Sequence, residues 1–123
     1  MVILKKAIIV TVMIPLIAHA ISKDEESKYL EIKNKYTQSD RELNILYSNQ
    51  IELYKNEKGD FYGQVVSKDI FLKKSQQVWI RFRDASCDYE TYESQTGTGY
   101  QSIYTQCLLD KTKERIKYLK ENN

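Results

Sequence analysis

The chain has few residues that interrupt helices. It contains one proline and four glycines in 123 residues, and it shows no internal repeat or low-complexity linker. Proline and glycine are the strongest local breaks in regular structure. Their scarcity predicts long helices with few interruptions, and the length fits one domain.

Histidine is as scarce as proline, because His19 is the only one. It lies in residues 1–20, "MVILKKAIIVTVMIPLIAHA", where two lysines precede a short apolar run and a small-residue Ala-His-Ala site. This pattern is typical of a secretory signal peptide cleaved after Ala20. The apolar run is shorter than the roughly 20 residues that span a bilayer, which disfavours the alternative of an uncleaved anchor. We therefore expect an exported protein, periplasmic or extracellular.

Cleavage would leave Ile21–Asn123, which contains no histidine. That composition excludes Ser–His and Cys–His catalysis and histidine-ligated metals. Of the 19 basic residues, Lys5 and Lys6 would be lost, leaving 17 against 17 acidic residues. A neutral chain has no electrostatic footprint for nucleic acid or for an anionic membrane. We expect no metal, no cofactor, no nucleic acid and no membrane span in the mature form.

Only two cysteines are present, Cys87 and Cys107. In an exported chain such a pair predicts a disulfide rather than a metal site or a nucleophile. The bridge would close a loop of about 20 residues and stabilise the fold by roughly 3 kcal/mol.

The first helix is predicted to begin near Ser39, because "SDRE" places Glu42 at capping-box spacing. Gly59 is its expected end. Residues 21–38 are expected to form a loosely ordered or short helical lead-in, and residues 39–123 the helical domain. The predicted core stripe of this helix is Leu43, Leu46, Tyr47, Gln50 and Tyr54.

A second helix is predicted to begin between Asp60 and Ser67 and to end near Cys87, and a third to run from about Tyr100 to Lys120. The apolar residues at helical spacing give each helix a core face. In the second helix this face comprises Phe71, Leu72, Ser75, Val78, Trp79 and Phe82; in the third it comprises Ile103, Tyr104, Cys107, Leu108, Ile116 and Leu119. We expect an all-α fold, a small three- or four-helix bundle or hairpin stapled by one disulfide.

Three blocks of the chain resemble the lysozyme-inhibitor LprI-like family of small exported bacterial domains. They are "SDRELNILY", "SQQVWIRFRDASC" and "TGTGYQSIYTQCLLDKTKERIKYL", which together span residues 39–119. The chain departs from the family in two respects. The upstream stretch "SKYLEIKNKYTQ" has no cysteine, so one family disulfide is absent, and the connection from Gln50 to Lys68 is long.

The resemblance assigns structural roles to positions that match the family blocks: Asp40, Leu43, Asn44, Gln76, Trp79, Arg83, Asp84, Thr112 and Arg115. Arg83 and Asp84 could grip a partner, but a polar network that holds the helices together is favoured. Arg115 could pair with Asp84, Asp40 or Glu42 between helices. Trp79 is interpreted as a core residue rather than a binding platform.

Acidic residues crowd the connection between the second and third helices. Paired carboxylates can hydrolyse glycosides, but they need a spacing of about 5 to 9 Å across a concave sugar site, which a small helical bundle rarely offers. We therefore expect no catalytic residues and no enzyme.

The same connection, "DASCDYETYESQTGTGY", is the predicted partner-binding surface. Its acids would steer a basic partner, its tyrosines supply contact area, and Cys87 would preorganise it. The candidate residues are Asp88, Tyr89, Glu90, Tyr92, Glu93 and Tyr100.

The expected partner is a protein, namely a basic lysozyme or another peptidoglycan hydrolase that the chain inhibits. The alternatives are a periplasmic immunity protein or a structural envelope protein with a different partner, and an ordinary polar loop. The sequence does not fix the oligomeric state.

Overall fold

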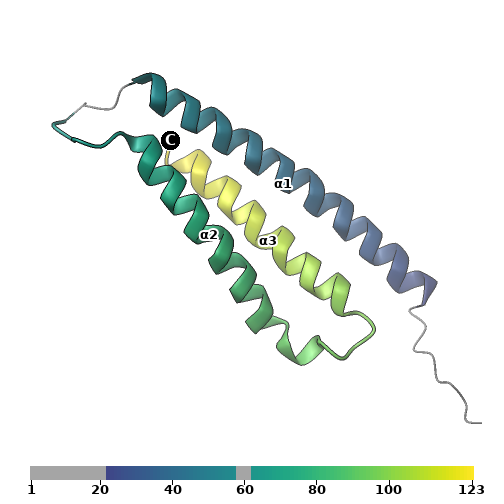
Figure 1. Cartoon of the computed structure of the whole chain (residues 1–123). Coiled ribbons are helices and arrows are strands. Elements are labelled where there is room, and N and C mark those ends of the chain that lie inside the picture. The colour runs from purple at the N-terminus through teal and green to yellow at the C-terminus, as the bar shows by residue number, and fades with distance from the viewer. Residues whose placement is uncertain (1–21, 58–61) are drawn as a thin grey trace, which may run out of the picture.

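The computed structural model describes residues 22–57 and 62–123, which form three α-helices and one short 3-10 turn (Figure 1). The elements are α1 (Lys23–Glu57), α2 (Lys68–Glu90), η1 (Tyr92–Ser94) and α3 (Tyr100–Glu121). The expected all-α fold with a Cys87–Cys107 disulfide is confirmed. The predicted signal peptide and the predicted stop at Gly59 lie outside the described residues.

The first helix is much longer than expected. α1 extends over 35 residues, and Ser39 lies buried in its interior, so the predicted helix start at Ser39 is wrong. Residues 23–38, expected to be a loosely ordered or short helical lead-in, are helical and continuous with the rest of α1. Three acids in the first turn stabilise the start of the helix, because their negative charges lie at the positive end of the helix dipole. Ser22 Oγ also accepts a hydrogen bond from the Glu25 N–H at 3.2 Å. Glutamate and lysine are also good helix formers, which a reading based on apolar residues undervalues.

Contact between α1 and α3 is the most extensive in the bundle. The two helices run parallel, with α2 antiparallel to both (Figure 1). Arg115 apart, the residues that α3 buries recur at alternating steps of three and four, the spacing of coiled-coil contact positions: Ser102, Thr105, Leu109, Thr112, Ile116 and Leu119. The small side chains among them allow the helix backbones to approach closely.

The core cluster consists of Leu43 from α1 with Ile116 and Leu119 from α3. Leu46, Leu72 and Trp79 are partly buried and pack against it. The predicted stripe of the first helix is confirmed, since Leu43, Gln50 and Tyr54 are buried and Leu46 and Tyr47 are half-buried.

The predicted core face of the second helix is largely wrong. Phe71, Val78 and Phe82 are exposed, at 58%, 51% and 66% respectively. The positions that α2 buries are instead Gln76, Arg83 and Cys87. The disulfide at Cys87 and the polar contacts of Gln76 and Arg83 fix the rotation of this helix, so its apolar flank is turned toward solvent.

The third helix matches its predicted bounds closely, but its core face is shifted. Ile103 is exposed, and Tyr104, Cys107 and Leu108 are half-buried, whereas Ile116 and Leu119 are buried as predicted. Threonine and serine occupy several of the buried positions, which an apolar pattern does not reveal. None of the described helices combines the length and apolarity needed to cross a bilayer.

Candidate protein-binding site at the connection between α2 and α3

The connection between α2 and α3 is anchored at its start. Cys87 is fully buried, and its Cα lies 5.8 Å from the Cα of Cys107. Thr91 Oγ1 donates a hydrogen bond to the Cys87 carbonyl oxygen at 2.7 Å, and the Thr91 N–H donates to the same oxygen at 3.1 Å. The Ser94 N–H then donates to the Thr91 carbonyl at 2.9 Å, so successive turns close the segment. These bonds hold the end of α2 and the turn that follows it in one conformation.

Most of the predicted partner-binding residues lie on the surface of this anchored segment. We call Asp88, Tyr89, Tyr92, Glu93 and Tyr100 the acidic tip. Tyr89 is 84% exposed and Tyr92 69% exposed, and Tyr100 is half-buried at the start of α3. Within the described part of the chain, no lysine or arginine nitrogen lies within 4.0 Å of the carboxylates of Asp88 or Glu93. These two charges are therefore available to a partner.

Glu90 differs from the other acids of the segment. Its carboxylate accepts a hydrogen bond from Lys111 Nζ at 2.7 Å, and this ion pair joins α2 to α3. Glu90 is exposed, but because Lys111 already compensates its charge it links α2 to α3 and is less available to a partner than Asp88 or Glu93.

Tyr104 belongs beside this surface, although the sequence pattern assigned it to the core face of the third helix. Its ring lies 5.7 Å from the ring of Tyr100, at a tilt of 40°. Burial raises the pKa of the Tyr104 phenol, and the carboxylates of Asp88 and Asp84 raise this pKa further because they disfavour a second negative charge nearby. The structure thus brings Tyr100, Tyr104 and Asp88 together.

The start of α1 also reaches the acidic tip, which the sequence analysis missed. An added Cβ at Gly99 would lie 3.3 Å from Glu25 Oε2, so this carboxylate sits close against the N-terminal end of α3. A negative charge is favourable at that end of a helix. The acidic run Asp24–Glu26 is the signal for it, but this run lies in the segment expected to be a loosely ordered or short helical lead-in.

Arg83, one of the family positions, contacts all three helices. Its Nε donates to Asp84 Oδ1 at 2.9 Å, and its Nη1 donates to Thr112 Oγ1 on α3 at 3.5 Å and lies 3.9 Å from Asp40 Oδ1 on α1. The guanidinium also lies over the ring of Trp79, 5.2 Å from its centroid. All of these contacts lie within the bundle, as expected for a polar network that holds the helices together.

Arg115 does not make the ion pairs considered for it. Its Nε donates to Gln76 Oε1 at 3.0 Å and its Nη2 to Ser75 Oγ at 2.9 Å, both on α2. Among the described residues no carboxylate oxygen lies within 4.0 Å of it, and the pairing with Asp84, Asp40 or Glu42 is wrong. Burial lowers the pKa of the Arg115 guanidinium, because the charged form is removed from water without a carboxylate beside it.

The remaining family positions are divided between core and surface. Leu43 is buried in the core, Trp79 is half-buried against it, and exposed Asn44 donates to Asp40 Oδ2 at 3.4 Å. Across residues 22–57 and 62–123, no group of three or more histidine, cysteine or acidic side chains is arranged to hold a metal ion.

Comparison with known proteins gives a consistent assignment. The profile of the family described as "Lysozyme inhibitor LprI" matches residues 22–119. An uncharacterized protein of Rhizobium meliloti (strain 1021) is 30% identical over 89 residues, which is 70% of this chain and 64% of that protein. The chain therefore spans less than two thirds of the length of this relative.

A solved structure is also similar. It is a DUF1311 family protein from Pseudomonas putida KT2440, with a TM-score of 0.65 and 27% sequence identity. The similarity covers 78% of this chain and 90% of that one, so it includes most of the three-helix bundle.

Proposed function

The chain belongs to the LprI lysozyme-inhibitor family, and from this membership we propose that it is an exported protein-binding domain that inhibits a lysozyme or a related peptidoglycan hydrolase. The observation that carries the proposal is the acidic tip, where two carboxylates without a basic neighbour stand beside exposed tyrosines on a segment held by a disulfide.

The charge of the acidic tip supports a basic partner. Asp88 and Glu93 present negative charge without a lysine or arginine beside them among the residues that the structure describes, whereas Glu25 at the start of α1 has Lys28 Nζ at 4.0 Å. Complementary charge speeds encounter with the partner and selects its orientation. Long-range attraction of this kind weakens as salt is added, because the Debye length falls to about 8 Å at physiological ionic strength.

The exposed tyrosines of the acidic tip supply contact area for a partner in addition to the charges. Tyr89, Tyr92 and Tyr100 offer large amphipathic rings with few rotatable bonds, so little side-chain entropy is lost when they are ordered. The disulfide and the Thr91 hydrogen bonds order the backbone before binding, which lowers the cost of association. A tip of this kind would inhibit by occupying the substrate cleft of the enzyme, one inhibitor per enzyme, without a chemical step of its own.

The direct test is hydrolysis of a bacterial cell-wall suspension by an animal-type lysozyme and by bacterial hydrolases, with the oxidised protein titrated in. We expect a saturating loss of activity for at least one enzyme, with an endpoint at one inhibitor per enzyme. The loss should weaken as salt is raised. Unchanged activity of every enzyme at micromolar protein would overturn the proposal.

Charge reversal locates the binding surface within the same assay. Asp88→Lys with Glu93→Lys should raise the concentration needed for half inhibition by about tenfold or more, since each reversal replaces an attraction with a repulsion. The matched control is Glu52→Lys with Glu57→Lys, two exposed acids near the other end of α1, roughly 40 and 48 Å from Glu25 at about 1.5 Å per residue. Equal loss of inhibition in both double variants would show an effect of net charge and would contradict the acidic tip as the binding surface.

A further inference from the structure

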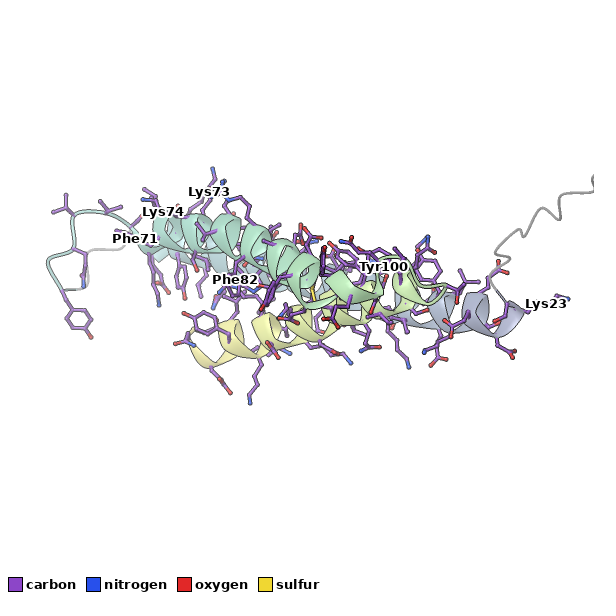
Figure 2. The ribbon with its side chains drawn as sticks, turned by 90° about the horizontal axis from the view of Figure 1, so that it is seen from below. Lys23, Phe71, Lys73, Lys74, Phe82 and Tyr100 are labelled. Carbon is purple, nitrogen blue, oxygen red and sulfur yellow. A yellow bond between two sulfur atoms is a disulfide. The ribbon has the colours of Figure 1, made fainter. Side chains whose placement is uncertain are left out.

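A second surface with a different character lies along the exposed flank of α2. Phe71, Val78 and Phe82 follow one another on this helix, and half-buried Trp79 lies next to them. Figure 2 shows Phe71 and Phe82 along α2, with Tyr100 of the acidic tip beyond the opposite end of the helix from Phe71. These side chains line an open groove of about 470 Å³, completed by polar residues of α2 and α3: Lys74, Ser75 and Arg115.

The polar lining of this groove is cationic. Lys74 and Arg115 are its charged residues, and no carboxylate lines it. Arg115 is only 7% exposed, and its charge has no carboxylate partner within 4.0 Å in the described ranges. Its two hydrogen bonds, to Gln76 and Ser75, use two of the five N–H donors of a guanidinium.

An anionic group in the groove would therefore be stabilised. A guanidinium that is removed from water gains more from a carboxylate than an exposed one does, because the surroundings screen the charges less. Lys74 at the edge would add a second attraction and would steer the group toward Arg115. The apolar side chains would pack against the hydrophobic part of the same ligand.

We propose that this groove binds an acidic, amphipathic peptide segment of a partner protein. The stripe from Phe71 to Phe82 covers 11 helical steps, roughly 16 Å, which is the length over which a three-turn helix presents anchors at i, i+4, i+7 and i+11. A carboxylate beside those anchors meets Lys74 and Arg115. This surface is separate from the acidic tip, so the inference is independent of the inhibitor proposal.

Trp79 makes the proposal directly measurable, because it is the only tryptophan of the chain and it lines the groove. The probe is a synthetic 14-residue helical peptide with leucines at i, i+4, i+7 and i+11 and glutamates elsewhere on its exposed face. We expect it to change the Trp79 emission saturably and to raise the anisotropy of a label on the peptide. A peptide with lysine in place of every glutamate should do neither.

The matched variants are Lys74→Glu, which reverses a charge in the groove, and Lys73→Glu, which reverses an exposed charge one position along α2 that does not line it (Figure 2). We expect Lys74→Glu to lower the affinity for the acidic peptide by about fivefold. Lys73→Glu should leave this affinity within about twofold of the wild-type value. Phe82→Ser, at an exposed position, should weaken it by about tenfold. Neither Lys74 nor Phe82 is buried, so each variant should keep the fold, which circular dichroism checks.

Four results of the peptide and vesicle experiments would overturn the proposal. They are no saturable change with the acidic peptide, equal binding of the lysine peptide, equal effects of Lys74→Glu and Lys73→Glu, and a Trp79 change with anionic lipid vesicles but not with peptide. A Trp79 change that depends on the concentration of the protein alone, together with dimers in sedimentation, would show that a second copy covers the groove and would also overturn it.

Discussion

At the scale of single residues, the two buried arginines of this protein have opposite surroundings. Arg83 has Asp84 at 2.9 Å and Asp40 at 3.9 Å, whereas Arg115 has the neutral oxygens of Gln76 and Ser75. Trp79 lies between them, with guanidinium carbons 5.2 Å and 5.5 Å from its ring. Arg83 is therefore suited to hold the helices together, and Arg115 lies beside the groove against aromatic rings, with no carboxylate of the described residues within 4.0 Å.

Replacing Arg83 should destabilise the bundle. Arg83→Ala removes the contacts to Asp84, Thr112 and Asp40, and we expect the free energy of unfolding in urea to fall by about 2 to 3 kcal/mol. Arg83→Lys should restore less than half of the lost free energy, because an ammonium lacks the planar guanidinium fork that contacts two neighbouring helices at once. Arg81→Ala, at an exposed position of the same helix, is the control and should change the free energy by less than about 0.5 kcal/mol. A loss at Arg83 no larger than at Arg81 would contradict the structural role.

Tyr36 should make stability depend on alkaline pH. Burial raises the pKa of its phenol above the ordinary value of 10.0, and Arg83 offsets only part of this. Because the folded state favours the neutral phenol, the unfolded chain loses the proton first as the pH rises. The contribution of Tyr36 is complete below pH 10 and is lost as the pH rises through the folded-state pKa.

The measurement is the free energy of unfolding in urea between pH 8 and pH 11. Its decline should be shallower in Tyr36→Phe than in the wild type. Tyr62→Phe, at a residue that is 90% exposed, should decline as the wild type does. Identical curves for all three proteins would show that Tyr36 does not contribute to the pH dependence.

At the scale of elements, the presence of the helices was easier to predict from the sequence than which face of each helix is buried. The third helix and the disulfide were predictable because glycines precede the helix and the cysteines have no histidine near them in a chain with an export pattern. The exposure of Tyr89 and Tyr92 was predictable for a different reason, since a polar, tyrosine-rich connection between helices stays on the surface. The ion pair of Glu90 was not predictable, because its partner, Lys111, lies 21 residues away in sequence.

The rotation of α2 could not be predicted from its apolar residues. Phe71, Val78 and Phe82 repeat at helical spacing, and burying them would remove apolar surface from water. The bundle instead buries Gln76 and Arg83, because their hydrogen-bond partners on α3 are in place. The length of α1 was missed for a related reason: its first four turns are charged, and Ile32 is the buried apolar anchor in them.

Removing the disulfide should destabilise the packing of α2 against α3 and loosen the acidic tip. Cys87→Ser with Cys107→Ser opens a cross-link over 20 residues, and we expect the free energy of unfolding to fall by about 3 kcal/mol. The helices should remain, because the α1–α3 seam does not involve the bridge, and circular dichroism in water should change little. Urea unfolding of the wild type with and without reductant is the companion measurement. Coincident transitions for oxidised and reduced protein would contradict the stabilising role.

At the scale of the whole molecule, the two candidate surfaces have opposite charge. The acidic tip at the α2–α3 connection carries Asp88 and Glu93, and the groove along α2 carries Lys74 and Arg115. A chain with 19 basic and 17 acidic residues is close to neutral overall, so partner selection depends on where the charges lie rather than on their sum. A basic hydrolase would be drawn to the tip and repelled from the groove.

The footprint of a bound hydrolase tests this account most directly. Amide hydrogen exchange would be measured on the oxidised protein alone and with a saturating amount of an animal-type lysozyme or of a bacterial hydrolase that it inhibits. We predict slower exchange at residues 88–100 and at the start of α1 beside Gly99, with no change along the flank of α2 from Phe71 to Phe82. Slower exchange along that flank, with residues 88–100 unchanged, would contradict the assignment of the acidic tip as the inhibitory surface.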